Sequence, residues 1–258
     1  MRLIEHSEIG GERPLFASRS VLLRDVTVHS GESALKCSTD VRAEHCRIEG
    51  MYAFWECNDV LCTDTVFSES ARACSWYGRN HSYSGCRIDA PKMFRELDGI
   101  TLADSTVKSG SETFWHCRNG RVTDVEMSGA EYCFLSSSEF LIERMTMQGK
   151  YAFQYSRNME IHNSVLDTKD AFWESEGCRV YDSEIRSEYL GWYSHGLHLI
   201  RCHISGTQPL CYCNDLVLED CTFSEDCDRC FEKSSVRGSV LGNVPSVMEP
   251  VFGKIEYK

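Results

Sequence analysis

The chain has 258 residues and a formal net charge of −12 at pH 7. This acidic balance argues against partners such as nucleic acid or an anionic membrane surface, because both attract positive charge. The start of the chain is polar and lacks the apolar core of a secretory signal, and no apolar run is long enough to span a membrane. We therefore expect a cytoplasmic protein without nucleic-acid or membrane partners.

A repeat of 19 to 21 residues runs along the chain. Ala-Phe-Trp-Glu stands at residues 53–56 and again at 171–174, with weaker copies around them. The centres of the eleven copies are Leu35, Phe54, Ser75, Phe94, Phe114, Phe134, Phe153, Phe172, Gly191, Cys211 and Cys230. A period this short and regular is typical of a solenoid. We expect a single domain over residues 1–258, with coils at 21–235 and caps at 1–20 and 236–258.

Each repeat opens with a segment in which apolar and polar residues alternate, such as residues 21–28 and 100–107. This alternation indicates a half-buried strand. The third and eighth positions are almost wholly apolar and should both face the core, so the chain must bend between them. The fifth position is rich in Asp, Asn and Gly, which tolerate the left-handed conformation. The predicted bends are Asp25, His45, Asp64, Gly85, Asp104, Asp124, Arg144, Asn163, Asp182, Arg201 and Asp220.

These features predict an all-β fold, a right-handed parallel β-helix of about eleven coils with about 19–20 residues each. Coils about 4.8 Å apart would make eleven of them span roughly 50 Å. A leucine-rich repeat has a similar period, but its Leu-x-x-Leu-x-Leu signature is absent.

The 15 cysteines follow the repeat and not a disulfide framework. Four of them share the small sixth position with Ser, Thr and Val: Cys46, Cys86, Cys202 and Cys221. This is how a small buried apolar residue is used, so we expect free thiols in a reducing compartment. Cys-x-Cys at 211–213 and Cys-x-x-Cys at 227–230 have spacings known from zinc sites. Because Cys211 is expected to point inward and Cys213 outward, no metal and no other cofactor is predicted.

The segment around each repeat centre carries most of the aromatic residues. The centre never holds a charge and should face the core. The next position should face outward, because it includes Lys36, Arg95 and Gln154, and it holds all five tryptophans. The position after that includes Glu56 and Glu96, whose burial would be costly. We therefore expect the strand to turn there, so that both positions line one outer face.

Aromatic residues at this density predict a binding surface. Flat rings between carboxylates and amides suit sugars, whose faces are apolar and whose rims carry hydroxyls. The predicted substrate-binding residues are Trp55, Glu56, Trp76, Tyr77, Trp115, Gln154, Trp173, Trp192, Tyr193 and Tyr212. The alternative is that a terminal segment or a partner subunit covers this face, so that the tryptophans are ordinary packing.

Coil spacing also limits the possible catalytic pairs. Glu56 and Glu96 lie two coils apart, about 9.6 Å, which is the upper limit for an inverting glycosidase. A lyase needs a base and a cation, and Arg95 and His116 lie one coil apart with Glu96 beside both. The predicted catalytic residues are Arg95, Glu96, His116, Tyr155 and Glu174. The alternative is a surface ion pair, which contributes little to stability.

The coil pattern and its Phe, Asp/Asn and Cys/Ser positions resemble the pectin lyase-like superfamily of right-handed parallel β-helices. A closer resemblance is to a bacterial domain-of-unknown-function family of that fold, carried by stretches such as ERPLFASRSVLLRDVT, SGESALKCS, YAFWEC, DAPKMFRELDGI and DAFWES. The resemblance implies the fold and work on carbohydrate, without a particular reaction. The polygalacturonase Asp-Asp motif is absent, and only Ser-His-Gly at 194–196 is similar to its Gly-His-Gly.

We therefore expect a carbohydrate-active protein, a hydrolase, lyase or isomerase, with a small-molecule sugar or an oligosaccharide as its ligand. Whether it is an enzyme stays open. The alternative is a non-catalytic binder, or a homo-oligomeric structural protein whose tryptophans form an interface.

Overall fold

The computed structural model describes residues 1–258 and contains two compact units, Met1–Gly129 and Ala130–Lys258. Both units are parallel β-solenoids, and the chain makes about 13 turns in all. The only helical element is a single 3₁₀ turn, η1 (Glu69–Ala71). The predicted fold class is therefore confirmed, whereas the prediction of a single domain stays a prediction. Each unit is described by itself below.

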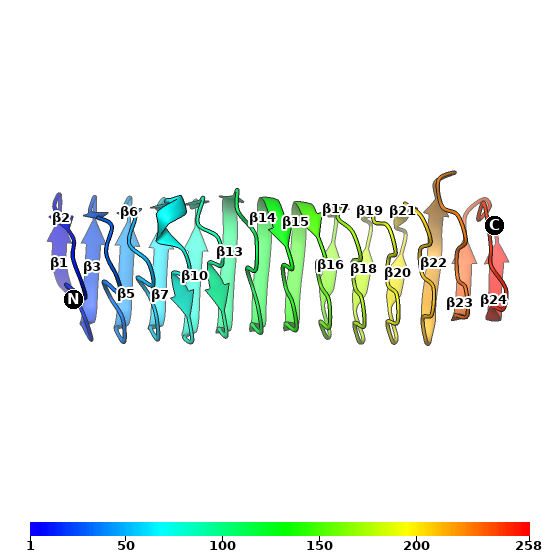
Figure 1. The fold of residues 1–258 in the computed structure, drawn as a ribbon, viewed down its shortest axis with the longest axis horizontal. Coiled ribbons are helices and arrows are strands. Elements are labelled where there is room, and N and C mark those ends of the chain that lie inside the picture. Colours follow the sequence, from blue (N-terminus) through cyan, green and yellow to red (C-terminus); the bar gives the residue numbers. More distant parts are fainter. The chain divides into compact units, whose positions relative to one another are not determined.

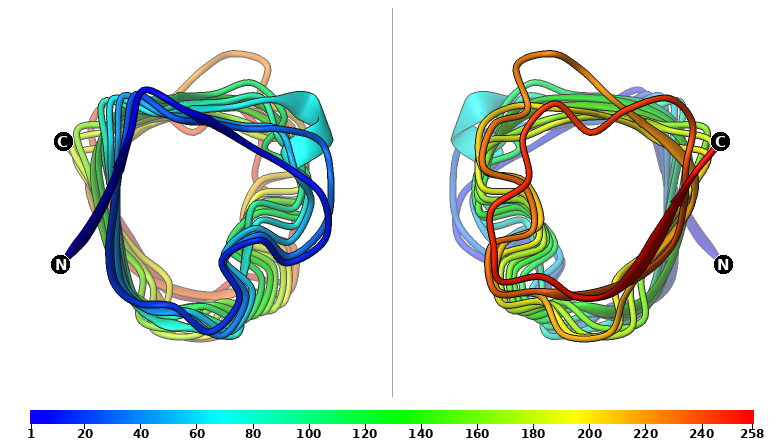
Figure 2. Two further views of the ribbon diagram at one scale, coloured as in Figure 1. Left: turned by 90° about the vertical axis from the view of Figure 1, so that its left-hand side faces the viewer. Right: turned by 90° about the vertical axis from the view of Figure 1, so that its right-hand side faces the viewer.

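In the first unit, long and short strands alternate along the chain and each kind forms a parallel ladder (Figure 1). The long strands are β1 (Arg2–Glu5), β3 (Arg19–Arg24), β5 (Thr39–Glu44), β7 (Asn58–Thr63), β10 (Arg79–Ser84), β13 (Asp98–Val107) and β14 (Arg118–Glu131). The short ones are β2 (Glu8–Ile9), β4 (Thr27–Val28), β6 (Arg47–Ile48), β8 (Val66–Phe67) and β11 (Arg87–Ile88), with β9 (Ser75–Trp76) and β12 (Phe94–Arg95) on a third side. Seen from the N-terminal end, the blue turns run clockwise as they recede, so this unit is right-handed (Figure 2).

The second unit repeats the arrangement. Its strands are β15 (Ser138–Lys150), β16 (Glu160–His162), β17 (Val165–Asp167), β18 (Arg179–Tyr181), β19 (Glu184–Arg186), β20 (His198–Ile200), β21 (His203–Ser205), β22 (Leu216–Phe223), β23 (Ser235–Val240) and β24 (Phe252–Tyr257). β24 pairs in parallel with β23, and β1 and β2 pair with β3 and β4 in the first unit. The segments expected as caps therefore carry further strands, which is why the chain makes more than eleven turns.

The bend between the long and short strands lies where the sequence predicts it. All eleven residues at the fifth position of the repeat have positive φ, between 47° and 64°. The residues that follow them, such as Val26, Cys46 and Ser164, are buried, as are the apolar third positions and the eighth positions other than the half-buried Phe223. A left-handed residue reverses the inward and outward alternation, and both apolar positions can then face the core.

Stacked rings fill much of the core. In the second unit Phe153 lies between Phe134 and Phe172, with ring centroids 4.9 and 4.8 Å apart and planes within 12° of parallel. All three side chains are fully buried. Burial of such large rings contributes strongly to stability.

The first unit also buries one polar network. His81 contacts the Tyr83 hydroxyl through Nδ1 at 3.1 Å and the Cys57 carbonyl through Nε2 at 3.0 Å. The Tyr83 hydroxyl lies 2.6 Å from Ser75 Oγ. Burial lowers the pKa of His81 to about 4, so this histidine is neutral near pH 7. Gly78 leaves room for the ring, because a Cβ there would lie 2.6 Å from His81 Nε2 and 2.1 Å from the Cys57 carbonyl oxygen.

Ion pairs connect neighbouring coils on the surface. His29 lies between two carboxylates, with Nε2 3.1 Å from Glu8 and Nδ1 3.3 Å from Glu49. These hydrogen bonds raise the pKa of His29.

All fifteen cysteines are free thiols, and only Cys37 is exposed. Burial raises the pKa of Cys57 to about 12. No helix in the structure is both long enough and apolar enough to cross a membrane.

Candidate functional site

Three positions of the repeat face outward around most of the buried centres, with buried exceptions such as Ala73 and Cys211. They lie two residues before the centre, one after it and two after it. The first and third of these have positive φ in nearly every coil, for example 56° at both Tyr52 and Glu56. Apart from β9 and β12, the segment consists of turns and not of the expected strand. The tryptophan position is half-buried and the position after it is mostly exposed, which confirms that both line one face. We call these three positions the aromatic face.

In the first unit, the aromatic face is a continuous stack of rings and cations. Trp55 and Trp76 have centroids 5.1 Å apart, and Lys36 lies 5.4 Å from the Trp55 ring. The Arg95 guanidinium lies between Trp76 and Trp115, at 4.3 and 4.4 Å from their centroids. Tyr77 packs edge-on against Trp55 at 5.2 Å, and Glu56 accepts a hydrogen bond from the Cys37 thiol.

The arginine of the predicted catalytic cluster, Arg95, is part of this stack. Arg95 is only 19% exposed and its ion pair is with Glu112, at 3.4 Å, rather than with Glu96. Glu96 and His116 are exposed, and their catalytic roles stay predictions. Tyr155 and Glu174 belong to the second unit, where a different arrangement surrounds them.

In the second unit, the aromatic face contains an open pocket of about 360 Å³. The pocket lies in the coil that contains Gln154, where the tryptophan position of the repeat holds an amide side chain. The lining residues are Tyr132, Tyr151, Gln154, Tyr155, Asp170 and Trp173. Tyr132 and Tyr151 stack with their centroids 4.8 Å apart and their planes 26° from parallel, so one wall of the pocket is a pair of stacked rings.

Asp170 is the acidic group of this pocket. It lines the pocket and is only 8% exposed. Burial raises the pKa of Asp170, and Glu188 raises it further, whereas Lys169 lowers it. A carboxyl group with a raised pKa in an aromatic pocket is a candidate for binding or proton transfer.

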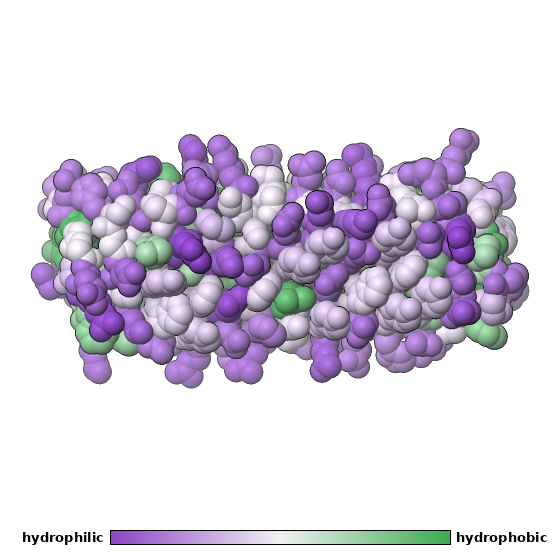
Figure 3. Space-filling model, viewed as in Figure 1, coloured by the Kyte–Doolittle hydropathy of each residue, from purple (hydrophilic) through white to green (hydrophobic).

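The aromatic face continues beyond the pocket in the second unit. Trp173 and Trp192 lie 5.6 Å apart, and Tyr193 packs against Trp173 at 5.4 Å. Tyr212 stacks on Tyr193 at 5.0 Å, with Lys233 beyond it at 5.7 Å. Figure 3 shows patches of pale residues, the class of intermediate hydropathy that includes Trp and Tyr, among purple charged residues.

The stacking of Tyr212 corrects the predicted register in the last two copies of the repeat. Tyr212 lies one position further along than predicted, because it is Leu210 and not Cys211 that follows Gly191 as the repeat centre. The left-handed φ values support this register, since 62° at Leu210 matches 69° at Gly191. Cys213 is consequently buried and not outward-facing. Phe231 occupies the next centre, fully buried, in place of Cys230.

Three residues of the pocket were not predicted from the sequence: Tyr132, Tyr151 and Asp170. All three lie two positions before the repeat centre. A signal was present, because this position also holds Tyr52 and Tyr189. The alternation rule assigned no outward direction to it, because the rule fails at left-handed residues.

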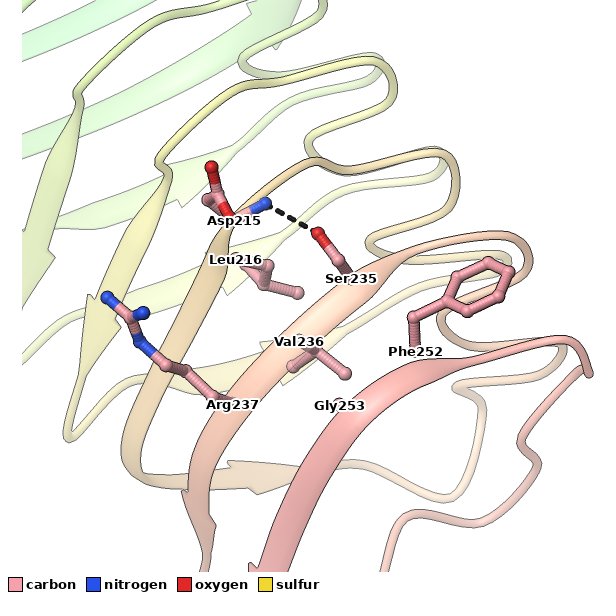
Figure 4. A pocket seen from close by; sticks show the side chains of 7 residues that line it. All are labelled: Asp215, Leu216, Ser235, Val236, Arg237, Phe252 and Gly253. Carbon is pink, nitrogen blue, oxygen red and sulfur yellow. Dashed lines mark hydrogen bonds between the residues drawn. The ribbon is translucent and has the colours of Figure 1, made fainter.

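A second hollow lies at the C-terminal end of the second unit, where β22, β23 and β24 begin (Figure 4). Leu216, Val236 and Phe252 supply its apolar lining, and the Asp215 N–H donates to Ser235 Oγ at 2.8 Å. No three His, Cys, Asp or Glu side chains come together as a possible metal site.

Comparisons with known proteins give a family. A family model described as "Protein of unknown function (DUF3737)" matches residues 2–258. A search of curated proteins found no match.

Among solved structures, the A-module of mannuronan C-5 epimerase AlgE4 from Azotobacter vinelandii is similar at 9% identity, covering 99% of this chain and 88% of that one, with a TM-score of 0.36. The periplasmic alginate epimerase AlgG is similar at 9% identity, covering 99% and 73%, with a TM-score of 0.30. HetL, a pentapeptide repeat protein from Nostoc sp. strain PCC 7120, is similar at 10% identity, covering 97% and 86%, with a TM-score of 0.25.

Proposed function

We propose that this chain, which belongs to the DUF3737 family of proteins of unknown function, is a carbohydrate-active protein. It binds a sugar in the pocket of the second unit. The observation that carries the proposal is the combination of stacked tyrosines, a tryptophan, an amide and a buried carboxyl group around one open pocket. Ligand sites are typically concave and mostly apolar, with a few polar groups that orient the ligand.

The lining residues divide the task of binding. The rings of Tyr132, Tyr151 and Trp173 offer flat apolar surfaces on which the apolar face of a sugar ring can lie. Gln154 can donate and accept hydrogen bonds, and Asp170 can accept them from hydroxyl groups. A sugar hydroxyl that reaches Asp170 would donate a hydrogen bond to its carboxyl oxygens.

The charges favour a neutral or amino sugar over a uronate. Asp170 faces the pocket and Glu188 raises its pKa further, so a ligand carboxylate would meet like charge. The net charge of −12 acts in the same direction. The ammonium group of an amino sugar would instead pair with Asp170.

Asp170 is also the group that we assign to proton transfer. General acid–base catalysis needs a group whose pKa lies near the working pH, and burial moves the pKa of Asp170 upward in that direction. Hydrolases, lyases and isomerases that act on sugars all need such a group. Tyr155 is one of three tyrosines in the lining of the same pocket, each of which carries a hydroxyl group.

The test is a thermal-shift screen with neutral sugars, amino sugars, uronates and short oligosaccharides in reducing buffer. A ligand at 100 times its dissociation constant should stabilise the protein by about 2.7 kcal/mol. Trp173→Ala should weaken binding about tenfold or more, which corresponds to about 1.4 kcal/mol. Trp55→Ala is the matched control, because it removes a tryptophan of the same repeat position in the first unit. Binding that Trp173→Ala and Asp170→Asn leave unchanged would contradict the proposed site.

A second candidate function is an interface between copies on the aromatic face. The observation that favours it is the exposure of Tyr155 and Tyr193, 46% and 47% respectively. Native mass and fluorescence quenching test this alternative. An oligomer whose tryptophans are protected from a soluble quencher would support it, and a monomer with accessible tryptophans would exclude it.

A further inference from the structure

Exposed large apolar side chains gather at two places besides the aromatic face. One group lies at the N-terminal end of the first unit and the other at the C-terminal end of the second. Their exposed fractions lie between 38% and 58%, and the residues are Met1, Leu3 and Phe16 in the first group and Leu241, Val247, Phe252 and Tyr257 in the second. Apart from these and the tyrosines of the aromatic face, Leu61 is the only exposed large apolar residue.

The C-terminal group surrounds an open strand edge. β24 pairs with β23, and the N–H groups of Phe252 and Lys258 donate to carbonyls of the preceding turn. Because backbone groups alternate in direction along a strand, Gly253, Ile255 and Tyr257 direct their N–H and C=O groups away from β23. These groups form an unpaired edge, which is a template for another strand.

The N-terminal group surrounds the complementary edge. β1 pairs with β3 in its own unit, and the His6 N–H donates to the Arg24 carbonyl at 3.1 Å. By the same alternation, Leu3 and Glu5 direct their backbone groups away from β3. These are the groups that a preceding strand of the solenoid would pair with.

The core positions match as well. Leu218 is aligned with Gly238, which is aligned with Ile255, so Ile255 ends the inward third position at one end. Ile4 is aligned with Leu23 and ends the same position at the other. Both isoleucines are only half-buried, unlike Leu23 and Leu218 at the same position, which are fully buried.

The hollow of Figure 4 adjoins this edge. Gly253 has no side chain to cover Val236, and Phe252 stands at the rim. If Ile255 is aligned with Ile4 of another copy, Phe252 is aligned with Met1 of that copy. A methionine beside an aromatic ring is a favourable contact, and it would cover a rim that is otherwise exposed.

We propose that β24 of one copy pairs in parallel with β1 of a second copy, with Ile255 opposite Ile4, so that the copies associate head to tail. Each end is therefore covered by the opposite end of a second copy of this chain. Such an interface is heterologous, because the two surfaces differ, and it leaves one free end of each kind on any open assembly. Association should therefore continue beyond the dimer as concentration rises.

Two proline variants test the proposal. Leu3→Pro and Tyr257→Pro each remove an N–H that points to an open edge and leave the pairing within the chain intact. Each variant alone should stay at monomer mass, whereas the wild type should form dimers and larger species. An equimolar mixture should give a 1:1 dimer and nothing larger, because each variant keeps the end that the other lacks. Circular dichroism of each variant confirms that it is folded.

Cross-linking tests the register. In a Cys37→Ser background, Leu3→Cys and Lys254→Cys should form an intermolecular disulfide, because the proposed register makes these residues neighbours. Leu3→Cys with Glu256→Cys is the matched control, since a shift of two residues separates the Cα atoms by about 8 Å, beyond disulfide reach. A wild type at monomer mass at every concentration, a mixture without dimers, or equal cross-linking of both pairs would overturn the proposal.

Discussion

Removing the central ring of the phenylalanine stack in the second unit should be among the most destabilising single changes. Phe153→Ala deletes a fully buried ring, and such substitutions cost about 3–5 kcal/mol. The ring also stacks on both neighbours at 4.8 to 4.9 Å, and each aromatic pair contributes about 0.5–1.5 kcal/mol. The backbone φ of 61° strains phenylalanine and alanine alike. The difference therefore reports the ring, and we expect a loss near the upper end, about 5 kcal/mol.

Equilibrium denaturation in urea, followed by both circular dichroism and tryptophan fluorescence, measures this loss. Phe153→Leu is the control, because it keeps apolar bulk without the stack and should cost less than about half as much. A double-mutant cycle with Phe172→Ala isolates the contribution of one stacked pair. A loss below about 1 kcal/mol for Phe153→Ala, the size of an average substitution, would refute the reasoning.

Three further predictions concern the first unit. His29→Gln should lower the thermal midpoint most below about pH 6 and have no effect well above it, because a raised pKa stabilises the folded state only while the histidine is protonated; melting curves across pH would check this. Gly78→Ala should cost about 1–3 kcal/mol in urea denaturation, since its Cβ would lie 2.1 Å from the Cys57 carbonyl oxygen. Arg95→Met should cost about 2 kcal/mol and change the tryptophan emission, because the guanidinium contacts two indole rings; unchanged emission would contradict this geometry.

The fold could be predicted from the sequence because its period is visible in single positions. Asp25, Asp64 and Asp182 mark left-handed bends, and the backbone is left-handed at each. Arg144 and Arg201 at the same position also have a left-handed backbone, although arginine has no preference for this conformation. The stacking of identical coils therefore overrides local preference where the two disagree.

The site could be predicted only in part. The outward direction of Trp173 and Glu174 followed from the cost of burying charge, and it is confirmed. The pocket itself could not be predicted from the sequence. The backbone of Asp170 is left-handed, and the rule that residues alternate between inward and outward fails at such a residue. The contact partner of Arg95 was also missed, since a sequence shows which residues are one coil apart and not which of them a long side chain selects.

The second half of the repeat shows a further limit. Cys211 and Leu210 are both apolar and adjacent, so hydropathy does not distinguish between them as the repeat centre. The stacking of Tyr212 on Tyr193 and the left-handed φ at Leu210 decide the register.

The buried cysteines have an experimental consequence. Fourteen thiols lie out of solvent at different points along both units, and one, Cys37, is open to it. A thiol-specific reagent added to the native protein should therefore modify Cys37 at once and the others only when the chain around them opens. The rate at which each buried thiol is modified then reports how often its stretch of the solenoid opens. Mass spectrometry measures these rates without any engineered label. Such a record would show whether the turns open one by one from the ends or together as a unit.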